Sequence, residues 1–195
     1  MKNNEILEIY KSEKALLDGH FILSSGKHSS VYLQSAIVLS NPKYLNKIAN
    51  DMVVNIKKII NIEKIDLVVS PAMGGIIIAC KVGEIINKNS IFLERVNKKF
   101  TLRRGFEIKR NQNILLIEDV LTTGKSSFES TECINSFGGN VLCLSTIIDR
   151  SSSNIKFKFP FTSLLKIDAP IFSDDNIPLE LSKIPAVKPG SRFIK

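Results

Sequence analysis

Long apolar runs are missing from this sequence, so no segment reaches the roughly 18 residues that a transmembrane helix needs. The N-terminal stretch MKNNEILEIYKSEKALLDG is charged and amphipathic, and it has no apolar central region of the kind that marks a secretory signal. Repeats, linkers and low-complexity blocks are absent as well. We therefore expect a single cytoplasmic domain over residues 1–195 that has no membrane partner.

Cysteine is scarce. Cys80, Cys133 and Cys143 are an odd number and follow no metal-ligand spacing. Each lies among apolar residues, and this setting favours buried, reduced thiols over a redox role.

Two familiar nucleotide-binding loops are also missing. The sequence contains neither the G-x-x-x-x-G-K-[ST] pattern of a P-loop nor the G-x-G-x-x-G pattern of a dinucleotide-binding fold. Any phosphate-binding segment in this chain must therefore be of another kind.

Acidic residues are fewer than basic ones, 19 against 27, and the net charge is +8. This excess is compatible with nucleic acid, with a polyanionic small substrate, or with a lysine-rich surface. Because no dense basic run is interleaved with aromatic residues, we expect no nucleic-acid partner and assign most of the charge to helix exteriors. One cluster is different: residues 94–107, ERVNKKFTLRRGFE, hold five bases between two strand signals, on a segment where several can converge on one anion.

What the sequence does contain is an alternation of helix and strand patterns. Helices are predicted at residues 4–18 (with Gly19 as the C-cap), 41–60, 75–87 and 125–137, and strands within 20–34 and at 65–69, 90–93, 114–117, 141–148 and 162–167. Such alternation predicts a parallel sheet that helices cover on both faces, with ligands at the carboxyl ends of its strands.

The most informative stretch is residues 114–127, ILLIEDVLTTGKSS. A buried strand runs into Glu118 and Asp119, and a turn rich in hydroxyl groups then leads into a helix. Backbone N–H groups of the turn and of the helix start form a phosphate cradle, to which the hydroxyls of Thr122, Thr123 and Ser126 add donors. The acids can accept hydrogen bonds from sugar hydroxyls, so the pattern indicates a ribose phosphate.

Three further segments have polar or small residues where ligands are expected. Residues 70–75, SPAMGG, follow a strand and allow close approach of a ligand to the backbone. Residues 21–32, FILSSGKHSSVY, offer backbone N–H groups near Ser25 and Gly26 to a carboxylate or a carbonyl group. Arg150 ends the strand after the phosphate turn, where a guanidinium can bind a carboxylate with two hydrogen bonds.

The two acids followed by D-x-x-T-T-G-x-S resemble the signature with which type I phosphoribosyltransferases bind 5-phosphoribosyl-1-diphosphate (PRPP). Together with the segments just described and residues 184–192, IPAVKPGSR, the motif resembles the orotate phosphoribosyltransferase family over nearly the whole chain. The resemblance implies an α/β type I phosphoribosyltransferase fold. Its parallel sheet is flanked by helices in a core of residues 41–159, and residues 1–40 and 160–195 form a small hood.

The resemblance also implies roles for individual residues. Lys98, Arg95 and Asp119 would be catalytic. PRPP would be bound by Glu118, Asp119, Val120, Leu121, Thr122, Thr123, Gly124, Lys125, Ser126, Arg95, Lys98 and Lys99, and orotate by Thr122, Arg150, Ser25 and Gly26. No protein metal site is implied, because Mg²⁺ would be held mainly by diphosphate, ribose and water. Other branches of the family carry a Lys where Ser24 stands, a Lys where Gly74 stands and a His where Phe100 stands. The substrate contact of the first of these lysines could be made here by Lys27.

The implied reaction joins orotate and PRPP into orotidine 5′-monophosphate and diphosphate, as in pyrimidine biosynthesis. The implied assembly is a homodimer in which each mobile 94–107 loop closes over the neighbouring subunit's site. Two alternatives stay open, a purine phosphoribosyltransferase and a PRPP-sensing regulator that binds nucleic acid.

Overall fold

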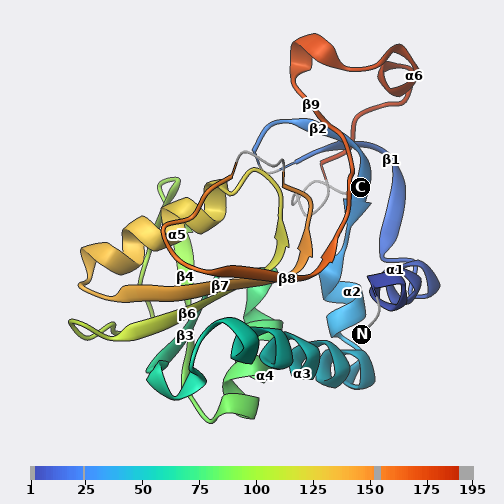
Figure 1. Cartoon of the computed structure of the whole chain (residues 1–195). Coiled ribbons are helices and arrows are strands. Elements are labelled where there is room, and N and C mark those ends of the chain that lie inside the picture. Colours follow the sequence, from blue (N-terminus) through green and yellow to red (C-terminus); the bar gives the residue numbers. More distant parts are fainter. Residues whose placement is uncertain (1–2, 24, 152–154, 189–195) are drawn as a thin grey trace.

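The computed structural model describes residues 3–23, 25–151 and 155–188, and it has the predicted α/β architecture (Figure 1). The central sheet has six strands in the order β5-β4-β3-β6-β7-β8. All neighbouring strands are parallel except β4 and β5, which form an antiparallel hairpin. The strand bounds are β3 Leu67–Pro71, β4 Ser90–Val96, β5 Lys99–Thr101, β6 Asn113–Leu121, β7 Asn140–Asp149 and β8 Phe161–Lys166.

Helices cover both faces of this sheet (Figure 1). One face packs against α1 (Asn3–Ser12), α2 (Ser35–Leu39), α3 (Pro42–Ile59) and α4 (Gly75–Ile86), and the other against α5 (Lys125–Ser136). Successive residues of β6 alternate between the two cores. Leu115 and Ile117 join the α3–α4 side, whereas Ile114 and Leu116 join the α5 side.

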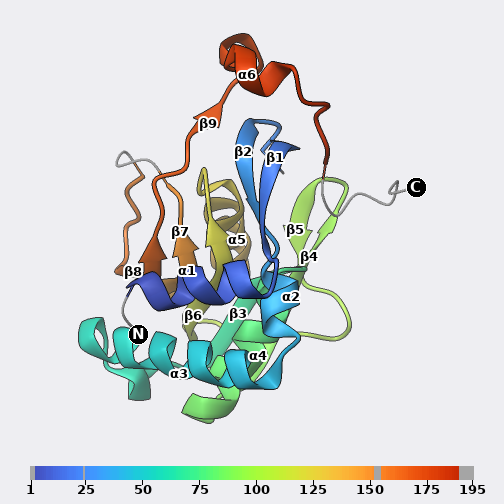
Figure 2. The same ribbon diagram turned by 90° about the vertical axis from the view of Figure 1, so that its right-hand side faces the viewer.

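The hood is a second, three-stranded sheet of order β1-β2-β9, built from β1 (Leu16–Ile22), β2 (His28–Leu33) and β9 (Ile171–Phe172). The short helices η2 (Asp174–Asn176) and α6 (Leu179–Ser182) follow β9, and η1 (Ile62–Lys64) lies outside the hood, after α3. The β1–β2 hairpin and the C-terminal segment stand above the carboxyl ends of β4, β6 and β7 (Figure 2). The β1–β2 hairpin and the segment from β9 to Val187 thus lie together over the edge where ligands are expected.

The predicted first helix is too long. It ends at Ser12, Lys14 takes a left-handed conformation (φ 53°), and the Ala15 amide donates to the Tyr10 carbonyl. Residues from Leu16 onward pair with β2, so Gly19 lies inside β1 and is not a helix cap. The apolar residues 16 and 17 therefore belong to a strand that forms by pairing with β2, and helical periodicity does not reveal this pairing.

Other differences are smaller. Strand β6 extends through Leu121, so the acid pair lies inside the strand, and α2 was not predicted. Cys80 is exposed, contrary to expectation, while Cys133 and Cys143 are buried free thiols. The start of α3 is as predicted, with Pro42 in its first turn and the Asn41 side chain accepting from the Lys43 amide. No helix in the described part of the chain is long and apolar enough to cross a membrane.

Candidate active site

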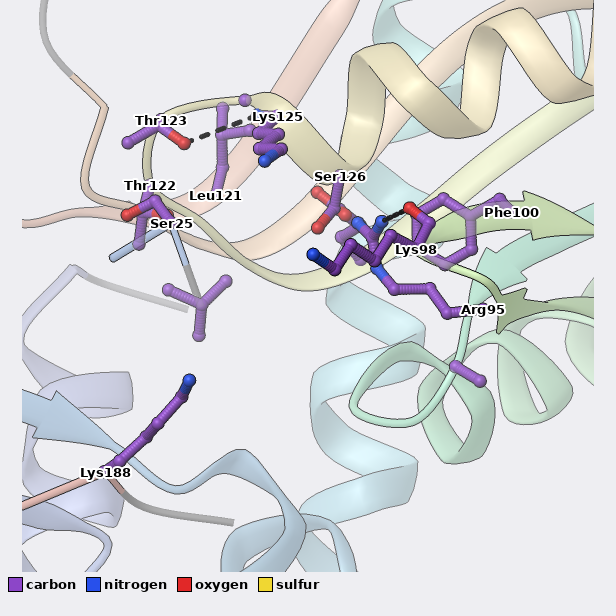
Figure 3. Close-up of a pocket in the computed structure, with 14 residues that line it drawn as sticks. Ser25, Arg95, Lys98, Phe100, Leu121, Thr122, Thr123, Lys125, Ser126 and Lys188 are labelled. Atoms are coloured by element: carbon purple, nitrogen blue, oxygen red, sulfur yellow. Dashed lines mark hydrogen bonds between the residues drawn. The ribbon is translucent and has the colours of Figure 1, made fainter. Parts of the chain in front are cut away.

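A cavity of about 520 Å³ opens between the carboxyl end of β6, the β4–β5 hairpin and the hood (Figure 3). The predicted turn, residues 120–126, supplies half of its lining. Arg95 and Lys98 enter from the hairpin, Ser25 from the loop after β1, and Lys188 from the C-terminal segment. Segments far apart in the sequence thus converge at the edge of the sheet that the alternation of strands and helices predicted.

The turn has the geometry of an anion cradle. Gly124 caps α5 with a φ of 73°, and a Cβ there would lie 3.1 Å from the Phe128 ring, so both backbone and space favour glycine. The positive N-terminal end of α5 follows at once, and the Thr122, Thr123 and Ser126 side chains surround it (Figure 3). A phosphate in this turn would meet backbone N–H groups, hydroxyls and the helix dipole together.

Glu118 lies on the α5 side of β6 and is only 4% exposed. Its carboxyl group accepts a hydrogen bond from the Ser127 hydroxyl. Burial raises the pKa of Glu118 to about 8, the Ser127 hydrogen bond and Arg95 oppose the rise, and Asp119 adds to it. Without a bound cation, this carboxyl group therefore holds its proton at neutral pH.

Asp119 points to the opposite face of the same strand and is not among the residues that line the cavity. Its carboxylate packs against the turn after β3, where a Cβ on Gly74 would lie 2.5 Å from Asp119 Oδ2. Burial raises the pKa of Asp119, and hydrogen bonds from the Val120 backbone and the Ser35 side chain oppose this rise. The two acids are therefore adjacent in sequence, but their side chains lie in different environments on opposite faces of β6.

The first part of the basic segment 94–107, through Thr101, belongs to the β4–β5 hairpin. Asn97 and Lys98 have positive φ angles of 51° and 68°, typical of a two-residue hairpin turn. Arg95 is held in place because it donates to the Lys98 carbonyl (2.9 Å), pairs with Glu129 of α5, and lies 4.0 Å from the centre of the Phe100 ring. Lys98 extends into the cavity beside it (Figure 3).

Several expected site residues lie outside this cavity. Lys99 is exposed and absent from the lining, and Arg103 and Arg104 pair with Glu94 instead of turning inward. The Gly26 amide already donates to the Leu23 carbonyl (2.9 Å), so that N–H group is occupied. The expected contact of Gly26 with orotate thus has no donor in this arrangement.

Arg150 is buried, and its guanidinium binds β2. It donates to the Val31 carbonyl (3.0 Å) and to the Ser29 hydroxyl (2.7 Å), and burial lowers its pKa. It lines a neighbouring pocket of about 340 Å³ together with Lys27, and this pocket shares Thr122 and Thr123 with the main cavity. Arg150 and Thr122 thus line one pocket next to the phosphate turn, and their joint role in binding orotate stays a prediction.

Sequence reasoning missed three residues that shape the site. Ser127 holds Glu118, Glu129 holds Arg95, and Lys188 enters the cavity from near the C-terminus. Ser127 and Lys188 stand inside the segments 114–127 and 184–192, but the motifs gave neither of them a role. Glu129 looks like an ordinary helix residue in the sequence.

The fold is shared with solved phosphoribosyltransferases. An orotate phosphoribosyltransferase from Aeropyrum pernix superimposes with a TM-score of 0.67 at 21% identity, covering 83% of this chain and 93% of that one. An adenine phosphoribosyltransferase from Thermoanaerobacter pseudethanolicus gives 0.58 at 15% identity, covering 70% and 88%. The fold and the phosphate turn together define a type I phosphoribosyltransferase. Because the chain resembles both enzymes, the fold alone does not identify which base is the substrate.

Sequence relatives resolve the family within this class. The chain is 43% identical to the orotate phosphoribosyltransferase of Thermotoga maritima over 190 residues, covering 97% of this chain and 100% of the relative. It is 42% identical to that of Erythrobacter litoralis over 192 residues, covering 98% and 99%. The chain belongs to the orotate phosphoribosyltransferase family. No protein-family model matches the chain.

Proposed function

We propose that this protein transfers the phosphoribosyl group of PRPP to orotate, releasing diphosphate and forming orotidine 5′-monophosphate in pyrimidine biosynthesis. One observation carries the proposal: the hydroxyl-rich turn, the Lys98 hairpin and the hood enclose a single cavity at the carboxyl end of β6. This arrangement matches a substrate with a phosphate at one end, a diphosphate at the other and a base beneath the hood.

The residues contribute by positioning and by charge. The 122–126 turn binds the 5-phosphate through N–H groups, hydroxyls and the α5 dipole. As the bond to diphosphate breaks, the sugar gains positive charge and the leaving group gains negative charge. Glu118 lies where its carboxyl group, once it ionises in response to the positive charge of the sugar, stabilises that charge, and Lys98 and Arg95 lie where cations stabilise the diphosphate. The hairpin and the hood limit access of water, which would otherwise hydrolyse PRPP.

Mg²⁺ fits this site as a companion of the substrate. Among the described residues no cluster of three or more His, Cys, Asp or Glu side chains could hold a metal ion. The only carboxyl group in the described lining of the cavity, that of Glu118, has its pKa raised to about 8 and is thus a poor metal ligand at neutral pH. Diphosphate, ribose and water oxygens would supply most ligands, and the bound ion would neutralise diphosphate charge.

We further propose a cytoplasmic homodimer that binds neither membranes nor nucleic acid. The family resemblance supports a dimer in which the β4–β5 hairpin serves the neighbouring site. In the single chain, the same hairpin lies beside the chain's own cavity. Subunit mixing, described below, distinguishes the two arrangements.

Turnover with PRPP, Mg²⁺ and a panel of bases tests the function directly. We expect loss of orotate absorbance and no reaction with adenine, guanine or hypoxanthine. Equal or faster turnover of a purine base would make the chain a purine phosphoribosyltransferase. Gel-shift titrations with DNA and RNA, at matched salt, test the regulator alternative, which predicts binding that responds to PRPP.

A further inference from the structure

A lysine from the C-terminal segment reaches the cavity from the side opposite the phosphate turn. Lys188 lines the same cavity as Thr122 and Lys98, and its ammonium group points towards the open space between them (Figure 3). Neither motif reasoning nor the roles implied by the family resemblance assign it any task.

Its backbone is held firmly enough to aim the side chain. Val187 bridges Phe21 of β1 in parallel, with the Ile22 amide donating to the Val187 carbonyl and the Val187 amide donating to the His20 carbonyl, both at 2.8 Å. Alternation along an extended segment then directs the next side chain, Lys188, to the opposite face from Val187.

A buried side chain adds a third anchor to this strap, defined as residues 184–188. His20 is 6% exposed, and its Nδ1 donates to the Ile184 carbonyl at 2.8 Å. On its other side, His20 Nε2 lies 2.6 Å from His28 Nδ1, and His28 Nε2 lies 2.7 Å from Asp174 Oδ1. A chain of hydrogen bonds therefore ties the strap to both β1 and β2 of the hood.

The charge of the cavity indicates what Lys188 contacts. The described lining contains four cationic side chains, Arg95, Lys98, Lys125 and Lys188. The described lining contains one acidic side chain, that of Glu118. Its carboxyl group is protonated near neutral pH because burial raises its pKa to about 8, so it does not offset the positive charge. Lining of this kind attracts an anionic ligand from several sides.

We propose that Lys188 is a substrate-contacting residue, which binds an anionic oxygen of the bound substrates across the cavity from the 122–126 turn. The inference rests on the proposed function for the identity of those substrates. The oxygen that Lys188 binds belongs either to a phosphate group of PRPP or to the carboxylate of orotate. His20 is the positioning residue that holds the strap in place.

Steady-state kinetics of four chains test the contact: wild type, Lys188→Ala, Lys188→Arg and Lys183→Ala. Lys183 is a matched control, since it lies on the same segment, is 61% exposed, pairs with Glu180 and is absent from the lining. Loss of a charge-assisted hydrogen bond should raise one KM roughly tenfold to a hundredfold in Lys188→Ala. Lys188→Arg should keep most of the affinity, and Lys183→Ala should match wild type.

The substrate whose KM rises identifies the source of the oxygen. A rise for orotate assigns Lys188 to the carboxylate, and a rise for PRPP assigns it to a phosphate. Unchanged KM values for both substrates, in a Lys188→Ala protein with wild-type thermal unfolding, overturn the inference.

Binding measured without turnover separates this inference from the proposed function. PRPP and orotate are titrated by calorimetry into wild type and Lys188→Ala. A wild-type protein that binds them without forming product defeats the proposed function, whereas equal affinities of the two proteins defeat the Lys188 contact. His20→Ala should raise the same KM as Lys188→Ala, and the double variant should be no worse than Lys188→Ala alone. Additive effects would show that His20 does not act through the strap.

Discussion

The carboxylate of Asp119 occupies the space that a side chain on residue 74 would need. A Cβ built on Gly74 would lie 2.5 Å from Asp119 Oδ2 and 2.7 Å from the other two carboxyl atoms. The turn after β3 and the acid at the end of β6, two separate motifs in the sequence, are therefore fitted to one another. The contact leaves no room for a side chain at position 74, where the family resemblance places a lysine in another branch.

This contact predicts that Gly74→Ala impairs catalysis without unfolding the protein. Gly74 has helical angles (φ −59°, ψ −35°), which alanine adopts readily at the start of α4. The new methyl group must displace Asp119, so we expect kcat/KM for PRPP to fall at least tenfold, or about 1.4 kcal/mol, while the thermal midpoint stays near that of wild type.

A double-mutant cycle with Asp119→Asn provides the control. If Gly74→Ala acts through Asp119, the two losses in kcat/KM should not add. Asp119 lies outside the described lining of the cavity, so its catalytic role is the one that the family resemblance implies. On that role, Asp119→Asn alone should cost roughly 2–4 kcal/mol of transition-state stabilisation, as expected for a preorganised charged group. Wild-type kcat/KM in Asp119→Asn would remove this acid from the mechanism.

The raised pKa of Glu118 predicts a pH-dependent stability. An unfolded glutamate releases its proton near its ordinary pKa of 4.5, whereas the folded one holds it up to about 8. Glu118 therefore contributes most to the free energy of unfolding below pH 4.5. This contribution of Glu118 decreases as the pH rises from 4.5 to 8, by no more than about 1.4 kcal/mol per pH unit. Glu118→Gln, which keeps the shape of the protonated form, should lose this trend.

Urea unfolding of wild type and Glu118→Gln at pH 5 and pH 8 measures this effect. The variant should gain stability relative to wild type at pH 8 but not at pH 5. Equal pH trends in the two proteins would mean that the folded carboxyl group titrates normally.

Lys98 is predicted to act mainly on the chemical step. It enters the cavity at the tip of the hairpin, so its charge matters most when diphosphate departs. Lys98→Ala should lower kcat and leave the affinity for orotidine monophosphate nearly unchanged, as measured by calorimetry. Lys99→Ala is the matched control, because the neighbouring lysine is exposed and outside the lining. A comparable fall in kcat in both variants would indicate a general effect of surface charge.

Mixing Lys98→Ala with Asp119→Asn chains tests which subunit the hairpin serves. The family resemblance predicts that mixed dimers regain one competent site, with an intact hairpin from one chain and an intact turn from the other. Verified mixed dimers that stay inactive would mean either that the hairpin acts within its own subunit or that Lys98 is not its working base.

Arg150 is predicted to tie the hood to the core. Two nitrogens of its planar guanidinium donate separately to the Val31 carbonyl and the Ser29 hydroxyl, whereas a lysine offers its donors from a single nitrogen. Arg150→Lys should cost roughly 1–3 kcal/mol of stability, since buried acceptors lose a donor, and should raise KM for orotate. Chemical denaturation and kinetics measure the two effects. A change in stability alone would leave Arg150 a purely structural residue.

The sequence by itself determined the class of fold and the phosphate turn. Alternating apolar runs fixed the parallel sheet, and the order of strand, acids, hydroxyls and glycine in residues 114–127 specified a cradle, because all its parts are local. Backbone conformation and helix dipole at such a turn depend on a few consecutive residues, so a sequence can encode them directly.

Only the tertiary structure decided how the remaining groups are used. Residues 16–18 became part of a strand because β2 lies beside them. Glu118 and Asp119 were separated because side chains alternate along a strand whose two faces have different neighbours. Lys188 reached the cavity because the strap is bonded to β1, more than 160 residues earlier in the chain. These relationships are set by packing between distant segments, and no local spacing in the sequence records them.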